Sequence, residues 1–171
     1  MLRAALIFRV RRACPRTNRA MRREHCQIRL VNRSDFPAPV YETAGASGLD
    51  LRAAIENEMV LVPHRVYRIP TGIYLEMPAG YEAQVRARSG LAFKHGVAMA
   101  NGVGTIDADY RGEIAALMIV LIDEPFTVHP GDRIAQLVFT PVVQPEIIVV
   151  ETVDALNQTD RGAGGFGHTG R

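Results

Sequence analysis

The stretch Tyr81-Glu-Ala-Gln-Val-Arg-Ala-Arg88 alternates between apolar and polar side chains and is the clearest structural signal in the chain. Successive side chains of a β-strand point to opposite faces, so one face of this stretch carries the apolar side chains and the other carries the polar ones. We therefore predict a half-buried strand whose polar face ends in Arg86 and Arg88.

Similar short runs on both sides of this stretch predict further strands, because they are rich in Val, Ile and Tyr and are separated by Gly, Pro and Asp. The run 114–122 is apolar throughout, which favours a strand buried on both faces. No long stretch has the 3.6-residue spacing of a helix, although residues 89–95 can form one helical turn. Many short strands predict an all-β fold, a distorted jelly roll or β-sandwich. The predicted strands are residues 26–31, 49–53, 59–62, 68–77, 81–88, 114–122, 134–143 and 147–153.

The charge of the chain is distributed unevenly. Residues 1–24 contain eight Arg and a single acid, Glu24, whereas the other 147 residues contain 12 Lys plus Arg and 17 acids. A nucleic-acid-binding protein normally carries its basic patch on the folded body, so no nucleic-acid partner is expected. No apolar run approaches the ~18 residues of a membrane-spanning helix, so no membrane partner is expected either.

A length of 171 residues favours a single domain. We expect a basic, disordered N-terminal extension over residues 1–24, a β core over 25–156 and a flexible Gly-rich arm over 157–171. The two cysteines, Cys14 and Cys26, are too few for a disulfide framework, which favours the reducing cytoplasm. An organelle is the alternative, since the Arg-rich extension resembles a transit peptide. Its lack of Ser and its Pro15 favour a plain extension, or a start at Met21.

Five segments mix Gly with Asp, Ser, Arg or Gln inside this apolar β pattern. The longest reads Asn101-Gly-Val-Gly-Thr-Ile-Asp-Ala-Asp-Tyr-Arg-Gly112, and the last contains Phe166 among glycines. Each segment alone is weak evidence, but the five in this order resemble the five motifs of the trimeric dUTPases. The resemblance extends from about Cys26 to the C-terminus. The segments are residues 44–51, 86–92, 101–112, 131–137 and 161–170.

The resemblance to the dUTPase family implies both a fold and an activity. The implied fold is the dUTPase-like β-clip, a distorted jelly roll assembled as a homotrimer with active sites shared between chains. The implied reaction is hydrolysis of dUTP to dUMP and pyrophosphate by in-line attack of an Asp-activated water on the α-phosphorus. Such an enzyme limits uracil incorporation into DNA and supplies dUMP for dTMP synthesis.

Two of the five segments match the family's substrate-binding motifs. In the second segment, Arg supplies forked donors, Ser supplies a hydroxyl, and Gly lets backbone N–H groups approach phosphate oxygens. In the third, the family's hairpin reads the uracil edge, and the Tyr ring packs under the deoxyribose, where it blocks a 2′-hydroxyl. Taken alone, the Arg also fits an exposed strand end and the Tyr an ordinary core aromatic. The implied substrate-binding residues here are Arg88, Ser89, Gly90, Asn101, Gly104, Thr105, Ile106 and Tyr110.

Three residues match catalytic positions of the family. Asp107 matches the general base that takes a proton from the attacking water, although by itself it also fits an ordinary turn. Gln136 matches a position near the α-phosphate and that water, and Arg161 matches a phosphate contact from the C-terminal arm. Asp132 and Arg133, which follow a Pro-Gly turn, are expected to be structural.

The resemblance also implies Mg²⁺ as the cofactor, held mainly by substrate phosphates and waters, because this ion keeps much of its hydration shell. Asp50 matches the first motif's Asp and is expected to order those waters or the neighbouring backbone. In the arm, Phe166 would stack on uracil, while Gly167, His168 and Thr169 would line the β- and γ-phosphates. His168 departs from the pattern, since many family members have Ser there.

Two other functions are compatible with the same fold. A dCTP deaminase-type enzyme would need a Glu at the position of Asp107 and a different C-terminal arm. A catalytically silent binding module would have lost Asp107, Gln136 or the arm with Phe166. All three are present, so the residues favour dUTP hydrolysis.

Overall fold

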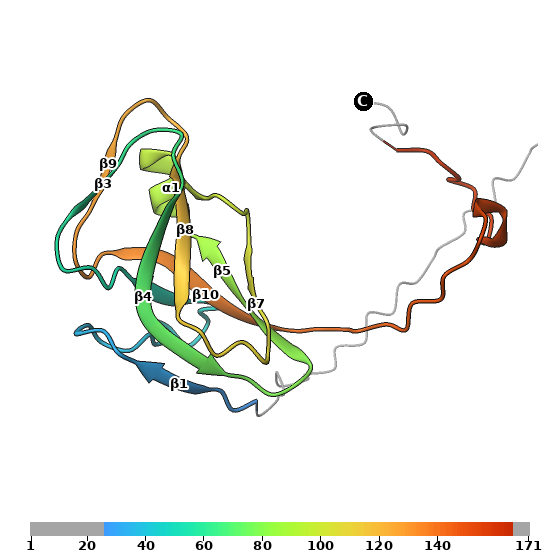
Figure 1. Ribbon diagram of the computed structural model, residues 1–171, viewed down its shortest axis with the longest axis horizontal. Coiled ribbons are helices and arrows are strands. Elements are labelled where there is room, and N and C mark those ends of the chain that lie inside the picture. The colour runs from blue at the N-terminus through green and yellow to red at the C-terminus, as the bar shows by residue number, and fades with distance from the viewer. Residues whose placement is uncertain (1–25, 166–171) are drawn as a thin grey trace, which may run out of the picture.

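A computed structural model describes residues 26–165, which form two four-stranded antiparallel sheets and a separate two-stranded sheet (Figure 1). Sheet A has the strand order β1-β4-β8-β6, sheet B has the order β2-β10-β5-β7, and β3 pairs with β9. The predicted basic extension over residues 1–24 lies outside the described residues. The elements are β1 Arg29–Asn32, β2 Leu49–Arg52, β3 Met59–Leu61, β4 Tyr67–Glu76, β5 Tyr81–Ala87, α1 Ser89–His95, β6 Val97–Met99, β7 Gly104–Ile106, β8 Ile114–Val120, β9 Phe126–Val128, β10 Arg133–Pro141 and η1 Val153–Ala155.

One hydrophobic core joins sheets A and B, and this arrangement confirms the predicted all-β fold. Alternate residues of the strands are buried; in β5, for example, Ala83 and Val85 are buried while Arg86 is exposed. Burial of one Leu or Ile side chain contributes ~1.5–3 kcal/mol, so the inward faces of the strands supply most of the stabilisation. The largest fully buried side chains include Leu51, Leu61, Ile69, Ile114, Met118, Ile134 and Leu137.

Strand β10 contains a β-bulge near its first residue. Arg133 pairs with Arg52 of β2, but Ala135, two residues later, pairs with Leu51, so Ile134 is an extra residue in the ladder. Ile134 and Ala135 are both buried. Because of the extra residue, Arg133 lies on the same outer face of sheet B as residue 136, although three positions separate them.

The alternation in the sequence predicts the longer strands well. The strands predicted at 49–53, 59–62, 68–77 and 81–88 are confirmed to within one residue at each end, and α1 confirms the helical turn at 89–95. The prediction that residues 114–122 are buried on both faces is wrong. Residues of β8 alternate between buried and half-buried, because only one face of this strand meets the core. Strands β6, β7 and β9, which have three residues each, were not predicted from the sequence.

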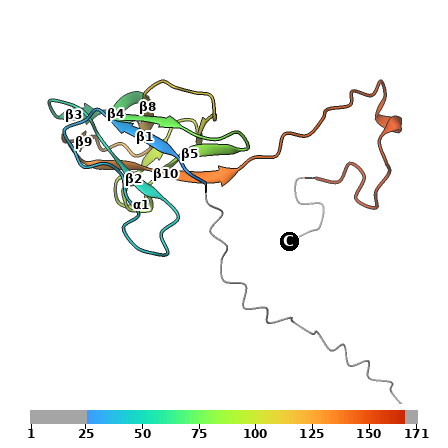
Figure 2. The same cartoon turned by 90° about the horizontal axis from the view of Figure 1, so that it is seen from below.

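The strand predicted at residues 147–153 is also wrong for this chain on its own. After Pro141 the chain leaves sheet B and extends away from both sheets, as Figures 1 and 2 show. A strand requires a partner that completes its backbone hydrogen bonds, and within residues 26–165 no segment pairs with this one. The same part of the chain has no helix long and apolar enough to cross a membrane. Exposed apolar side chains follow the extended segment: Val143, Ile147, Ile148, Val149 and Val153.

Candidate functional site

An open cavity of about 450 Å³ lies beside sheet B at the start of α1. It brings together residues of three segments that are far apart in the sequence, and most of its lining is polar or charged. The cavity contains five of the residues singled out from the sequence, together with Lys94 and His95, which the sequence patterns did not suggest. The lining residues are Asp50, Arg88, Ser89, Gly90, Leu91, Lys94, His95 and Gln136.

The pairing of three neighbouring strands places the polar side chains of this cavity on one face. Asp50 of β2 pairs with Gln136 of β10, which in turn pairs with Arg86 of β5. Directly paired residues share a face of the sheet, and this face is opposite the core. Arg88, two residues after Arg86, continues the same side at the end of β5. The register of sheet B therefore gathers the carboxylate, the amide and the guanidinium.

The side-chain amide of Gln136 has a neighbour on each of its two polar atoms. Its Nε2 donates a hydrogen bond to the carbonyl oxygen of Ala87 over 2.9 Å. Its Oε1 lies against Gly48, where an added Cβ atom would approach to 2.7 Å. Gly48 therefore leaves room for the amide, and the amide is held at the rim of the cavity by the end of β5.

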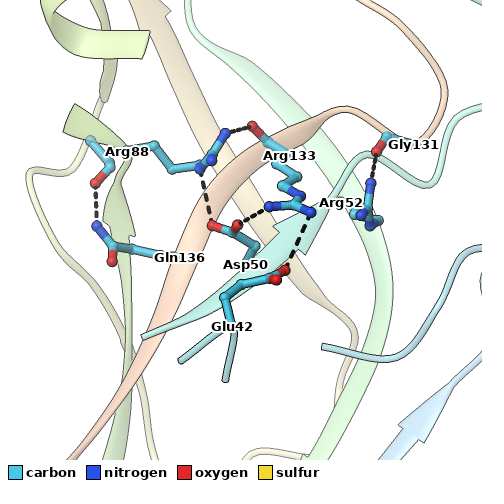
Figure 3. Close-up of polar contacts among 8 residues, drawn as sticks. Glu42, Asp50, Arg52, Arg88, Gly131, Arg133 and Gln136 are labelled. Carbon is cyan, nitrogen blue, oxygen red and sulfur yellow. Dashed lines mark hydrogen bonds and ion pairs between the residues drawn. The ribbon is translucent and has the colours of Figure 1, made fainter. Parts of the chain in front are cut away.

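An ion-pair network surrounds Asp50, as Figure 3 shows. Its Oδ1 lies 3.0 Å from Nε of Arg88, and its Oδ2 lies 3.1 Å from Nη1 of Arg133. Arg133 also pairs with Glu42 over 3.3 Å, and its backbone oxygen accepts a hydrogen bond from Nη1 of Arg88 over 2.9 Å. Charge-assisted contacts on both edges of the guanidinium restrict the position of Arg88.

Arg133 was expected to be structural, but it contacts two residues of the site directly. The only sequence signal for this role is the pair of adjacent apolar residues, Ile134 and Ala135, which interrupts the alternation and marks the bulge. Both oxygens of Asp50 are occupied by guanidinium groups, and residues 26–165 contain no group of three His, Cys, Asp or Glu that could hold a metal ion. The surroundings of Asp50 therefore indicate that it orients the side chains of Arg88 and Arg133. Its contact with water molecules bound to Mg²⁺ stays a prediction.

The start of α1 lines the cavity with backbone groups. The first turn of a helix leaves backbone N–H groups without intrahelical acceptors, and Ser89 and Gly90 occupy this turn. Both are exposed, and an added Cβ at Gly90 would meet no atom within 4 Å. The fold itself therefore does not require glycine at position 90, whereas a ligand close to this backbone would.

The third sequence segment forms the turn between β6 and β7. Gly102 has a positive φ of 70° and its N–H donates to the oxygen of Met99, which closes the turn at Asn101. Gly104 is buried, and an added Cβ there would lie 3.3 Å from Nδ2 of Asn101 and from Cβ of Val85. Thr105, by contrast, is exposed. The turn thus holds Asn101 close to β7.

Asp107 and Tyr110 follow β7 in an exposed turn. The Tyr110 N–H donates to the backbone oxygen of Asp107 over 3.1 Å, and the Tyr110 hydroxyl donates to the oxygen of Glu113 over 3.2 Å. The Tyr110 ring packs over Gly112, whose missing Cβ would collide with the hydroxyl. The carboxylate of Asp107 is exposed and has no hydrogen-bond partner among the described residues.

The structure separates the candidate residues into two groups. Ile106 of β7 is paired near the start of β5, whereas Arg88 follows the end of β5, so the turn at Asp107 and the cavity lie toward opposite ends of this strand. Ile106, which pairs with Ala83, belongs to the β7 group. Arg161 belongs to neither group: it lies on the extended C-terminal segment, where its Nε donates to the oxygen of Gly164 over 2.7 Å. Four further candidates, Phe166, Gly167, His168 and Thr169, lie outside the described residues.

Comparisons with known proteins agree with these features. A family model described as dUTPase matches residues 22–170. A deoxyuridine 5′-triphosphate nucleotidohydrolase of Brucella melitensis is 52% identical over 145 residues, which cover 84% of this chain and 90% of the relative. A protein of the same description from Finegoldia magna is 49% identical over 144 residues, covering 84% of this chain and 99% of the relative.

Solved structures share the fold at low sequence identity. A dUTPase mutant of Staphylococcus bacteriophage 80alpha with dUpNHpp has a TM-score of 0.71 and 24% identity, covering 85% of this chain and 99% of the other. A dUTPase mutant of phage phi11 of S. aureus, described with a structural Mg(II) ion, has a TM-score of 0.65 and 23% identity. That match covers 75% of this chain and 99% of the phage protein.

Proposed function

The chain belongs to the dUTPase family, and we propose that it is a dUTP diphosphatase that releases dUMP and pyrophosphate. The observation that carries this proposal is the match of residues 22–170 to one family, together with a cavity that gathers the first, second and fourth sequence segments. In its proposed cellular role the enzyme limits uracil incorporation into DNA and supplies dUMP for dTMP synthesis.

The cavity beside α1 is the proposed site for the triphosphate. Arg88 supplies guanidinium donors, Ser89 supplies a hydroxyl, and the backbone at Gly90 is accessible to a phosphate oxygen. Charge-assisted hydrogen bonds of this kind are shorter and about twice as strong as neutral ones. Lys94 and His95 extend the same lining, so a chain of phosphates would meet several donors along the cavity.

The turn between β6 and β7 is the proposed reader of the nucleoside. Backbone groups at Gly104 and Ile106, with the Asn101 amide, suit the alternating acceptors and donor of the uracil edge, and Thr105 lies in the same strand. Tyr110 would pack under the deoxyribose and leave a 2′-hydroxyl without a partner. A buried polar group without a hydrogen bond costs about 1–3 kcal/mol, which would favour dUTP over UTP.

The proposed reaction is an in-line displacement at the α-phosphorus. A water oxygen forms the new bond, the bond to the leaving pyrophosphate breaks, and the water proton passes to the carboxylate of Asp107. That carboxylate is exposed and has no hydrogen-bond partner within residues 26–165, which leaves it available to a water. Gln136 would orient the water or the α-phosphate, and Arg161 would approach the phosphates from the arm.

Mg²⁺ is the proposed cofactor, and the substrate phosphates and waters would hold most of its coordination positions. The ion would neutralise charge that develops on the pyrophosphate. In the arm, Phe166 would cover the uracil, and Gly167, His168 and Thr169 would contact the outer phosphates.

A homotrimer with shared active sites is the proposed assembly. Within one chain, Asp107 and the cavity at Asp50 lie toward opposite ends of β5, so a second chain is the simplest source of the missing half. The extended segment after Pro141 supports contact between chains, because exposed apolar side chains such as Ile148 and Val149 gain from burial. Light scattering coupled to size exclusion would measure the mass, and a monomer that is fully active would refute shared sites.

Pyrophosphate release tests the proposed activity. Purified protein with Mg²⁺ should release pyrophosphate from dUTP far faster than from dTTP, dCTP or UTP. Release of ammonia from dCTP would identify a deaminase instead, and no turnover of any of the four would favour a binding module. The proposed compartment is the cytoplasm, with an organelle as the alternative. We also propose that the chain is divided into a β core over residues 25–156 and a C-terminal arm over residues 157–171.

A further inference from the structure

Glu42 lies outside the cavity, yet it is joined to Arg88 by a continuous series of ion pairs (Figure 3). We propose that Glu42 is a positioning residue for phosphate binding. By pairing with Arg133 it holds that side chain on Asp50, and Asp50 in turn keeps Arg88 directed at the cavity. This inference rests on the proposed function, since it concerns the binding of the same triphosphate.

The hydrogen bonds of Arg88 show why its position matters. Its Nε contacts Oδ1 of Asp50 and its Nη1 donates to the backbone oxygen of Arg133. Its Nη2 has no acceptor among residues 26–165 and is therefore available to a ligand. Both contacts that fix the guanidinium depend on Arg133, one directly through its backbone and one through the shared carboxylate of Asp50.

The charges explain why a second acid is needed. Two guanidinium groups, Arg88 and Arg133, share the single carboxylate of Asp50, which leaves one excess positive charge. Like charges at close range repel each other, and Asp50 alone cannot neutralise both. Glu42 contacts Nη2 of Arg133, the nitrogen that Asp50 does not use, and makes the group of four neutral. Without Glu42, repulsion between the two guanidinium groups would favour movement of the Arg133 side chain away from Asp50 and into solvent.

The backbone around the network is built to hold these partners in place. The bulge at Ile134 turns Arg133 to the outer face of sheet B. Glu42 directly precedes a turn in which the Ala46 N–H donates to the oxygen of Thr43 over 3.1 Å. The same loop is anchored by Phe36, whose ring would lie 2.6 Å from a Cβ added at Gly131.

An opposite effect of Glu42 must be weighed, because its negative charge also repels a triphosphate. This carboxylate is 53% exposed and does not line the cavity, so solvent and salt weaken its long-range repulsion. Asp50, the residue through which it acts, is only 20% exposed. The short contact therefore dominates, and loss of Glu42 should weaken phosphate binding instead of strengthening it.

Glu42→Gln removes the charge while keeping the length of the side chain, and Glu76→Gln is a matched control. Glu76 pairs with Arg29 over 3.4 Å and is 52% exposed, but it lies on β4, remote from the network. Calorimetry should show that Glu42→Gln weakens binding of dUpNHpp about two- to fivefold, the range expected for one exposed ion pair. Glu76→Gln should bind as the wild type does.

Three further readouts separate positioning from a general structural effect. Inhibition by deoxyuridine, which has no phosphate, should be unchanged in Glu42→Gln, and KM for dUTP should rise while kcat stays within about twofold. In an Arg133→Gln background, Glu42→Gln should have no additional effect. Equal dUpNHpp affinity in Glu42→Gln and Glu76→Gln, tighter binding, weaker deoxyuridine inhibition, or an undiminished effect without Arg133 would each overturn the inference. If the wild-type protein does not hydrolyse dUTP, the proposed function itself fails.

Discussion

Replacing Gly48 with Ala would displace the side chain of Gln136 while leaving the strands in place. The added Cβ would lie 2.7 Å from Oε1 of Gln136 and 3.4 Å from Cγ2 of Val138. The nearer atom is the end of a flexible side chain, so the amide can move away. The backbone of Gly48 has no positive φ, so alanine adopts its conformation without strain.

The expected effect on stability is small and the effect on the reaction is large. Movement of the amide breaks its hydrogen bond to the oxygen of Ala87, which costs about 0.5–1.5 kcal/mol. Replacement of glycine restricts the unfolded chain and returns about 0.4–1 kcal/mol, so the two terms nearly cancel. A displacement of about 1 Å at a group that contacts the reacting atoms can cost as much as ~10²-fold in rate. We therefore expect kcat to fall about 10- to 100-fold.

Gly45→Ala is the matched control, because it lies in the same segment and an added Cβ there meets no atom within 4 Å. Steady-state pyrophosphate release gives kcat and KM for both variants, and thermal unfolding confirms that both are folded. The reasoning would be refuted if Gly48→Ala and Gly45→Ala had the same kcat. In that case the amide of Gln136 either does not move or does not act in the reaction.

Three further changes test separate parts of the structure. Asp107→Asn should lower kcat about 10²–10⁴-fold, the usual cost of losing a general base, while dUpNHpp still binds. Asp109→Asn serves as the control. Near-normal turnover of Asp107→Asn would contradict the assignment of Asp107 as the general base. A chain truncated before Arg161 should bind dUTP but lose most of kcat, whereas unchanged turnover would show that the arm has no catalytic part. Thr71→Val removes the buried hydroxyl that donates to the oxygen of Ile114 over 2.6 Å. Denaturant unfolding should show a loss of about 1–3 kcal/mol with kcat unchanged, and an unaltered midpoint would mean that the carbonyl finds another donor.

Local alternation predicts a strand only where the partner strands belong to the same chain. Strand β5 has neighbours on both sides and was predicted to within one residue. The segment 147–153 contains five Val or Ile residues where β5 contains one, but it forms no ladder because no described segment pairs with it. Its β propensity describes side chains that fit a half-buried surface, and that surface has to be supplied from elsewhere.

Some residues of the site were predicted from the sequence, whereas the position of Arg133 is known only from the structure. Motif order placed Asp50, Arg88 and Gln136 in one site, and the register of sheet B gathers these three around one cavity. Arg133 was expected to be structural because it follows the Pro-Gly turn, and period-2 alternation, counted back from Gln136, also puts it on the core face.

One inserted residue, Ile134, reverses that parity and brings the guanidinium to Asp50. A bulge changes which face every preceding side chain of the strand occupies, so an error of one residue in register changes a chemical role. The adjacent buried pair Ile134 and Ala135 is the trace that such an insertion leaves in a sequence. Where two adjacent apolar residues interrupt the alternation beside a Pro-Gly turn, the polar residue before them should therefore be placed on the outer face of the sheet, together with the site residues.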